Sequence, residues 1–156
     1  MKKFLALFTA TGMYSGYLRP FSGTWGTIPA WLIGYYLIQG DTTLMIAVTI
    51  IAFILSVWSA GEAEKYFVHD GKSIVMDEWA GMFVTFLFLP FSLLSYGIAF
   101  FAFRLFDVVK IAPAAQFENL PGGWGVTMDD IAAGVYANIF TQAVLFALTY
   151  FEITIG

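Results

Sequence analysis

The sequence predicts an all-α protein, a polytopic bundle of membrane helices that forms a single domain over residues 1–156. Two observations lead to this prediction. Apolar residues make up 60% of the chain and charged residues only 12%, with a mean hydropathy of +0.79, which is far outside the range of soluble domains. Several long stretches also carry no charge, and each approaches the length that crosses the roughly 30 Å hydrocarbon core of a bilayer. We therefore expect about four to five membrane helices after a short N-terminal segment.

The uncharged stretches define the expected helices in chain order. The N-terminal segment MKKFLALFTATGMYSGYLRP lacks a persuasive small-residue cleavage site, so we expect it to be retained. Pro29 suits the first turn of the next helix, because that position needs no N–H donor. The expected helical segments are 29–39, 42 to about 65, 79–103 with an interruption near Pro90, and 131–151.

The charge distribution predicts the topology. All seven Lys and Arg residues lie in or beside four polar segments, whereas the turn QGDTT and the C-terminal tail carry only Asp41 and Glu152. The positive-inside rule places the four basic segments in the cytoplasm. This requires residues 79–103 to enter and return as a hairpin near Pro90. The alternative is one long span kinked at Pro90; we prefer the hairpin because it gathers the ionisable motifs on one face.

Composition also excludes several classes of protein. The net charge of −4 argues against a nucleic-acid partner, which would recruit a basic surface. The absence of cysteine rules out disulfides and thiolate metal sites. His69 is the single histidine, which excludes a lipid phosphatase that uses one histidine as nucleophile and another as acid.

Two acid pairs, Asp77–Glu78 and Asp129–Asp130, open apolar stretches. Carboxylates near a hydrocarbon boundary are costly unless they are paired or bind a cation, so they indicate function. The structural alternative is that these acids cap helix N-termini. Capping would explain the presence of one acid pair, but it is a weaker explanation for two pairs together with Asp70 and Asp107. Oxygen ligands without cysteine favour Mg²⁺ or a similar hard cation.

Each acid pair has a glycine one helical turn later, Gly81 after Asp77 and Gly134 after Asp130. Glycines at these positions would let two helices approach closely enough for both pairs to reach one ion. Ordinary small-residue packing between membrane helices is a sufficient alternative explanation.

The segment FAFRLFDVVK carries Arg104, Asp107 and Lys110 at intervals of three residues, which places them on one side of a helix. The two cations suit a phosphate held between them and a metal ion. The alternative is a helix end at which the basic residues snorkel to the interface and the Asp pairs with them.

Two glycine-rich segments, 21–29 and 120–127, are expected to be loops whose backbone N–H groups approach an anion. Thr24 and Thr27 could add hydroxyl donors in the first. Neither segment has the spacing of a nucleotide-binding loop, and a glycine-rich loop alone is usually only a turn.

Four segments together resemble the phosphatidylglycerophosphatase A family, small bacterial membrane enzymes that hydrolyse phosphatidylglycerophosphate to phosphatidylglycerol and phosphate with Mg²⁺. They are FSGTWGT, VHDGKSIVMDEWAGM, FRLFDVVK and PGGWGVTMDDIAAG, in the family's order from about Pro20 to Gly134. Two positions depart from the family's usual pattern, because Ser22 and Ile111 stand where proline is usual. Neither departure removes an ionisable group.

The resemblance and the residue chemistry imply a membrane phospholipid as substrate, Mg²⁺ as cofactor, and a site on the cytoplasmic face of the bacterial inner membrane. Asp70 or Asp107 would orient and deprotonate the attacking water, and a covalent aspartyl phosphate is the open alternative. The remaining roles fall into two groups. Asp77, Glu78, Asp129 and Asp130 would bind one or two Mg²⁺ ions, and Thr24, Gly26, Thr27, Arg104 and Lys110 would hold the phosphate.

Three alternative functions would use the apolar chain and its carboxylates differently. A small membrane cation transporter or channel would use the same carboxylates as an ion pathway. A Mg²⁺-dependent phosphatidyl transferase would need a run of widely spaced aspartates that the sequence lacks. A purely structural subunit would leave the acid pairs unexplained. A homodimer is compatible with the short helices and many aromatic residues, but nothing in the sequence requires it.

Overall fold

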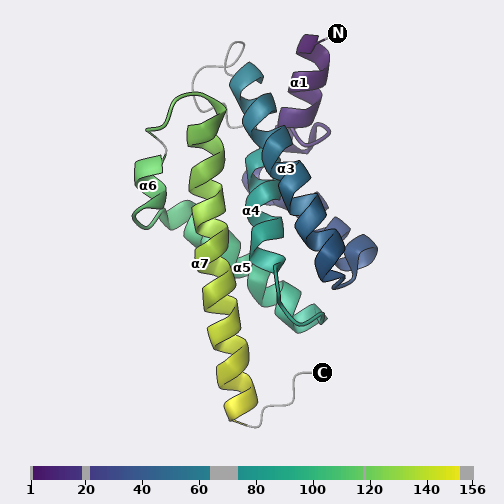
Figure 1. Ribbon diagram of the computed structural model, residues 1–156, viewed down its shortest axis with the longest axis vertical. Helices are drawn as coiled ribbons and strands as arrows, with labels where there is room; N and C mark the ends of the chain where they lie inside the picture. Colours follow the sequence, from purple (N-terminus) through teal and green to yellow (C-terminus); the bar gives the residue numbers. More distant parts are fainter. Residues whose placement is uncertain (1, 19–21, 64–73, 118, 152–156) are drawn as a thin grey trace.

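The computed structural model describes residues 2–18, 22–63, 74–117 and 119–151, and this part of the chain is helical and contains no strand. The prediction of an all-α fold is therefore confirmed (Figure 1). The elements in chain order are α1 (Lys2–Ala10), the 3₁₀ turn η1 (Ser15–Tyr17), α2 (Ser22–Leu32), the π-helical segment η2 (Ile33–Ile38), α3 (Thr42–Ala63), α4 (Met76–Phe86), α5 (Leu93–Val109), α6 (Ala114–Phe117) and α7 (Gly123–Tyr150).

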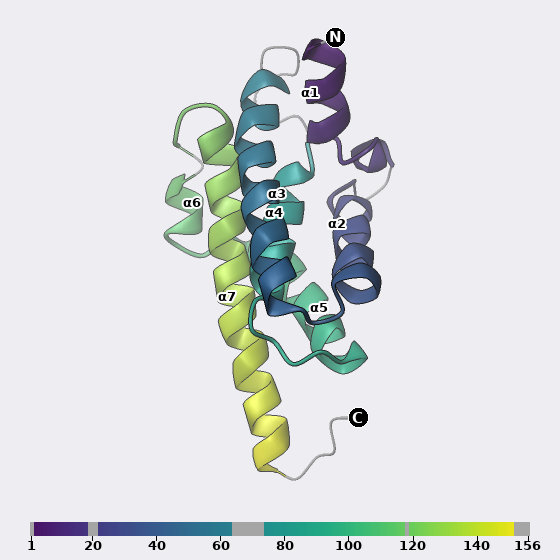
Figure 2. The ribbon, with the colours of Figure 1, turned by 45° about the vertical axis from the view of Figure 1, so that its right-hand side comes forward.

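The helices form an elongated bundle in which α4 is central. Helix α4 packs against α7 on one side and against α3 and α2 on the other, while α5 crosses against α7. Helix α7 is the longest, and its C-terminal end extends beyond the other helices (Figures 1 and 2). The largest buried side chains of the apolar core are aromatic: Phe83 and Phe86 of α4 lie with Tyr96 and Phe103 of α5. The rings of Phe86 and Tyr96 stack at 4.1 Å.

The prediction of two glycine-rich loops is wrong. The first segment is helical from Ser22, and the second is helical from Gly123, where α7 begins. Helix α2 begins at Ser22, and Pro29 lies inside it rather than in its first turn. Packing explains the difference: a Cβ on Gly26 would lie 2.6 Å from the side chain of Val75, and one on Gly23 would lie 2.6 Å from the guanidinium of Arg104. These glycines allow close helix contact, and such tertiary contacts override low intrinsic helix propensity.

The segment 79–103 forms two helices rather than one kinked helix. Helix α4 ends at Phe86, and α5 begins at Leu93 after Ser92, whose hydroxyl caps the helix by accepting a hydrogen bond from the Ser95 N–H at 3.1 Å. The chain then returns, because Arg104 near the end of α5 lies 3.4 Å from Glu78 at the start of α4. The hairpin prediction is confirmed as a reversal of the chain within the bundle.

Two of the described helices, α3 with 22 residues and α7 with 28, are long and apolar enough to cross a membrane. Their outward faces carry exposed large apolar side chains, including Ile50 and Ile54 on α3 and Ile139 and Phe146 on α7. Helices α4 and α5 have 11 and 17 residues, which at about 1.5 Å per residue are shorter than the hydrocarbon core. The count of four to five membrane helices stays a prediction.

A glycine contact joins α4 to α7. A Cβ on Gly134 would overlap the carbonyl oxygen of Gly81, and a Cβ on Gly81 would lie 2.6 Å from the carbonyl oxygen of Asp130. The two backbones therefore touch, as the spacing of the glycines after the acid pairs predicted. Without a strong hydrophobic drive between helices in lipid, such close packing is a main source of helix association.

We predict that Gly134→Ala destabilises the fold by about 1–3 kcal/mol, because the added methyl meets a backbone atom that cannot rotate away. Thermal unfolding of the detergent-solubilised protein measures the effect. The matched control is Gly97→Ala in α5, where a Cβ meets nothing within 4 Å. Equal thermal stability of the two variants would contradict the assigned contact.

Candidate active site

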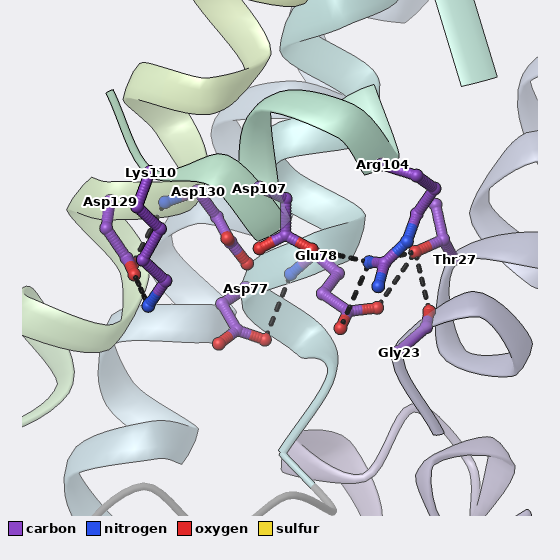
Figure 3. A network of polar contacts seen from close by, with 9 residues as sticks. All are labelled: Gly23, Thr27, Asp77, Glu78, Arg104, Asp107, Lys110, Asp129 and Asp130. Atoms are coloured by element: carbon purple, nitrogen blue, oxygen red, sulfur yellow. Dashed lines mark hydrogen bonds and ion pairs between the residues drawn. The ribbon is translucent and has the colours of Figure 1, made fainter. Parts of the chain in front are cut away.

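A polar cavity of about 720 Å³ lies where the first turns of α2, α4 and α7 meet the C-terminal end of α5. Figure 3 shows the charged side chains of these helices gathered around it. Its lining contains both acid pairs and all three charged residues of FRLFDVVK. The lining residues are Ser22, Gly23, Ile74, Asp77, Glu78, Arg104, Asp107, Val108, Lys110, Asn119, Val126, Asp129 and Asp130.

Arg104 connects three helices on one side of the cavity. Its Nη1 lies 2.7 Å from a carboxylate oxygen of Asp107 on α5 and 3.4 Å from Oε1 of Glu78 on α4. The same nitrogen donates to the hydroxyl of Thr27 on α2 at 3.3 Å. The guanidinium suits this role because its planar donors can serve several acceptors at once.

Thr27 is fully buried beneath this network. Its Oγ lies 2.8 Å from the carbonyl oxygen of Gly23 and 2.8 Å from Oε2 of Glu78, so its single proton can be donated to either. The hydroxyl thereby links the first turn of α2 to the carboxylate of Glu78 (Figure 3).

Lys110 joins α5 to α7 on the other side. Its ammonium lies 2.9 Å from Oδ2 of Asp129. The residue ends α5 in the left-handed conformation, with φ of 45°, which costs a non-glycine residue roughly 1–2 kcal/mol. The strained turn places the ammonium beside the second acid pair.

Asp77 and Asp130 are almost fully buried, with exposed fractions of 7% and 5%, and both face the same cavity. Asp77 bonds a backbone N–H of the first turn of α4, so helix capping remains possible for it, but capping does not account for Asp130. Asp130 lies in the second turn of α7, beyond its unpaired N–H groups, and the oxygen of Asp77 accepts a bond from the adjacent Glu78 N–H at 2.9 Å. The capping explanation is thus excluded for the Asp129–Asp130 pair.

The charge balance of the cavity favours a bound cation. Among the described residues, five carboxylates and two basic side chains line it, which is an excess of three negative charges when all of these are ionised. An anionic substrate would be repelled by this lining unless a multivalent cation offset it. The oxygen donors are those that Mg²⁺ prefers, although no three acidic or histidine side chains of the described residues are already gathered at metal-binding spacing. The chemistry of the donor set therefore fits a hard cation.

The structure brings most of the expected site residues together. Asp107 lines the cavity beside Arg104, while Thr27 lies just below the surface of the lining. Gly26 packs against Val75 and Glu78, and its carbonyl oxygen accepts a bond from the Trp79 indole. Thr24 lies elsewhere, in an apolar groove between α2 and α5. Asp70 lies outside the described residues.

Three polar contributors to the cavity were not predicted: Ser22, Gly23 and Asn119. Ser22 and Gly23 form the first turn of α2, where backbone N–H groups have no helical partner and favour an anion. The sequence analysis expected backbone N–H groups of residues 21–29 to approach an anion, but from a loop rather than from the start of a helix. Asn119 precedes the second glycine-rich segment, and one amide in a turn gives no signal of its own.

The described helices form a bundle with one charged cavity, and two of them are apolar and long enough to be consistent with a membrane protein. The model of the phosphatidylglycerophosphatase A family matches residues 8–145, so the chain belongs to that family. The family assignment does not favour the cation transporter that we kept as an alternative.

Two individual relatives carry the name of this family, and a third is named for a different phospholipid substrate. The chain is 34% identical to phosphatidylglycerophosphatase A of Haemophilus influenzae over 145 residues, covering 90% of this chain and 86% of that protein. It is 34% identical to phosphatidylglycerophosphatase A of Escherichia coli over 129 residues, covering 81% and 75%. A Bacteroides thetaiotaomicron protein, named provisionally as a phosphatidylinositol-3-phosphatase, is 36% identical over 145 residues, covering 87% and 91%. No solved structure matches the chain.

We predict that Arg104→Met lowers stability more than Lys110→Met. Loss of Arg104 leaves Glu78 and Asp107 without the guanidinium at largely buried positions, and breaking such a buried pair costs about 3–5 kcal/mol. The Lys110 side chain is 34% exposed, against 18% for Arg104, so water replaces more of its interaction. Thermal unfolding of both variants in the same detergent gives the ranking, and the reverse order would contradict it.

Proposed function

We propose that the protein is a Mg²⁺-dependent phosphatidylglycerophosphatase, which hydrolyses phosphatidylglycerophosphate to phosphatidylglycerol and inorganic phosphate. We place it in the bacterial inner membrane with its site on the cytoplasmic side. The observation that carries the proposal is the single cavity that collects both acid pairs, Arg104, Lys110 and the first turn of α2. Family membership and the named activity of two relatives support it.

The basic residues provide the phosphate-binding part of the site. Arg104 and Lys110 lie on the α5 side of the cavity, and the first turn of α2 adds backbone N–H groups beside Gly23. In the proposed complex the terminal phosphate shares these cations with the carboxylates that already contact them, since Arg and Lys each present several donors. The same groups would stabilise charge on the phosphoryl oxygens in the transition state.

The two acid pairs would hold Mg²⁺, Asp77 and Glu78 from α4 and Asp129 and Asp130 from α7. When bound, the ion would polarise the phosphoryl group and offset its charge. The protein's own part is to hold the four carboxylates on two helices whose backbones touch, so that their separation is set by the fold. Arg104 and Lys110, which contact Glu78 and Asp129, hold two of these carboxylates in place.

Of the two aspartates expected to orient and deprotonate the attacking water, Asp107 is the one that the structure describes. It lines the cavity, and its carboxylate is fixed by Arg104 at 2.7 Å. A positioned carboxylate within hydrogen-bond reach of a water can act as general base. Asp70 is the alternative base from the sequence, and direct attack by an aspartate on phosphorus is the alternative route.

A membrane location suits this substrate. The phosphate of a phospholipid lies at the interface, and its acyl chains stay in the hydrocarbon, so a charged cavity on an apolar bundle can take the headgroup without extracting the lipid. The exposed apolar side chains of α3 and α7 provide the surface that contacts the bilayer.

We predict that the purified protein releases inorganic phosphate from phosphatidylglycerophosphate in detergent micelles with Mg²⁺, and that EDTA abolishes the release. Asp129→Asn should lower kcat/KM at least about 100-fold, because it weakens both the proposed metal site and the contact with Lys110. The control is Asp41→Asn, in an exposed turn where the carboxylate only accepts a bond from the Leu44 N–H. Phosphate release that persists in EDTA would refute the metal dependence, and no release from folded protein would refute the proposed activity.

The orientation has its own test. The chain has no cysteine, so single cysteines can be placed at two exposed glutamines, Gln39→Cys and Gln116→Cys. In intact cells a membrane-impermeant maleimide should label the first and spare the second until the membrane is opened, because the basic segments are assigned to the cytoplasm. The opposite labelling pattern would invert the proposed orientation.

A further inference from the structure

An apolar groove of about 270 Å³ lies between α2 and α5, and the proposed function does not yet use it. Its lining is apolar apart from one hydroxyl. The lining residues are Thr24, Ile28, Trp31, Gly97, Phe100 and Phe101. One rim residue, Phe101, is 74% exposed, so the groove opens on the outer surface of the bundle.

The groove exists because α2 and α5 touch near their ends and separate between them. At one end a Cβ on Gly23 would meet the guanidinium of Arg104 at 2.6 Å. At the other end the indole N–H of Trp31 donates to the carbonyl oxygen of Tyr96 at 2.9 Å. The two helices thus run in opposite directions, and Thr24 to Trp31 covers about 10 Å of groove at about 1.5 Å per residue.

The groove and the charged cavity lie next to each other along both helices, on either side of the contact between Gly23 and Arg104. Gly23 lines the cavity and its neighbour Thr24 lines the groove. On the opposite wall, Arg104 lines the cavity and Phe100, one helical turn earlier, lines the groove. A ligand that binds the cavity through an anionic group and carries an apolar tail would therefore meet an apolar channel directly beside its anionic site.

Gly97 keeps the groove open. A Cβ at this position would meet no atom within 4 Å, so the absence of a side chain here is not required by helix packing. The glycine instead leaves a notch in the α5 wall opposite Ile28 and Trp31 of α2.

We propose that the α2–α5 groove holds one acyl chain of the phospholipid whose phosphate lies in the cavity. This inference rests on the proposed function and adds to it the way in which the lipid is oriented. Because the tail of a membrane lipid is already in hydrocarbon, the groove contributes little transfer free energy. Its effect is on orientation: a chain seated between the two helices holds the headgroup beside Arg104 and the first turn of α2.

The test compares two substrates with the same headgroup, long-chain phosphatidylglycerophosphate and its deacylated, water-soluble form. Gly97→Leu fills the notch from α5, and Ile28→Phe narrows the groove from α2. Each should lower kcat/KM for the long-chain substrate about tenfold and change that for the deacylated substrate less than about twofold. An equal loss on both substrates, or no loss on either, would overturn the groove assignment.

Two control variants make the comparison specific. Gly97→Ala adds only one methyl to open space and should leave both activities unchanged. Ala132→Leu fills a second apolar hollow, between α6 and α7 near the acid pair, which is lined by Pro113, Phe117, Met128, Ile131, Ala132, Val135 and Tyr136. Selective loss of long-chain activity in Ala132→Leu, with normal activity in Gly97→Leu, would assign the chain to that hollow and refute our proposal.

Photolabelling needs no hydrolysis, so it tests the binding of an acyl chain in the groove independently of the proposed enzyme activity. A long-chain phosphatidylglycerophosphate with a photoreactive diazirine in one chain should label residues 22–32 and 93–103 of the wild type, and unlabelled substrate should compete where phosphatidylcholine does not. Labelling spread over the exposed faces of α3 and α7 without competition would show bulk lipid only and overturn the groove. Competed labelling of α2 and α5 without phosphate release from either substrate would support the groove while refuting the hydrolase activity.

Discussion

The contact between the backbones of α4 and α7 is the constraint on which the site depends. Gly81 and Gly134 meet so closely that neither can carry a side chain without displacing the other helix. Because each glycine follows an acid pair by one helical turn, the same contact brings Asp77 and Asp130 to one cavity. Helix packing and the separation of the carboxylates are therefore set by one interaction, and a shift of either helix would change both.

Acids brought together in this way repel one another, and α5 supplies the charges that make the arrangement stable. The hairpin after α4 returns the chain so that Arg104 reaches Glu78 and Lys110 reaches Asp129. The two cations lie on one helix, yet they contact acids on two others, so α5 connects α4 to α7 electrostatically. The described lining keeps an excess of negative charge that a divalent cation would offset, which connects the stability of the bundle to its proposed chemistry.

The sequence allowed the charged half of the site to be predicted, but not the conformation around it. Acid pairs followed by glycines, and cations spaced by three residues, have few structural explanations in an apolar chain, so their convergence could be expected. The segment around Gly23 and Gly26 was different, because a glycine that permits a turn and one that permits a helix contact look alike until the packing partner is known. The partners, Val75 and Arg104, lie about 50 and 80 residues away in the sequence, beyond the reach of local patterns. For the same reason Thr24 was assigned to the phosphate, whereas its helical register turns it toward the apolar groove.

Helices α2 and α5 together border a charged cavity at one end and an apolar groove toward the other. At one end Gly23 and Arg104 border a charged cavity, and toward the other Gly97, Ile28 and Trp31 border a groove with no charged group. A phospholipid has the same division, with its phosphate and its chains joined through one glycerol. Two short helices that touch only near their ends can therefore match both parts of the substrate, provided that they stay in register. The Trp31–Tyr96 hydrogen bond fixes that register at the groove end. The Thr27–Glu78–Arg104 network fixes it at the other end, and because Glu78 and Arg104 also belong to the proposed metal and phosphate sites, the groove and the phosphate site are held in one geometry by shared residues.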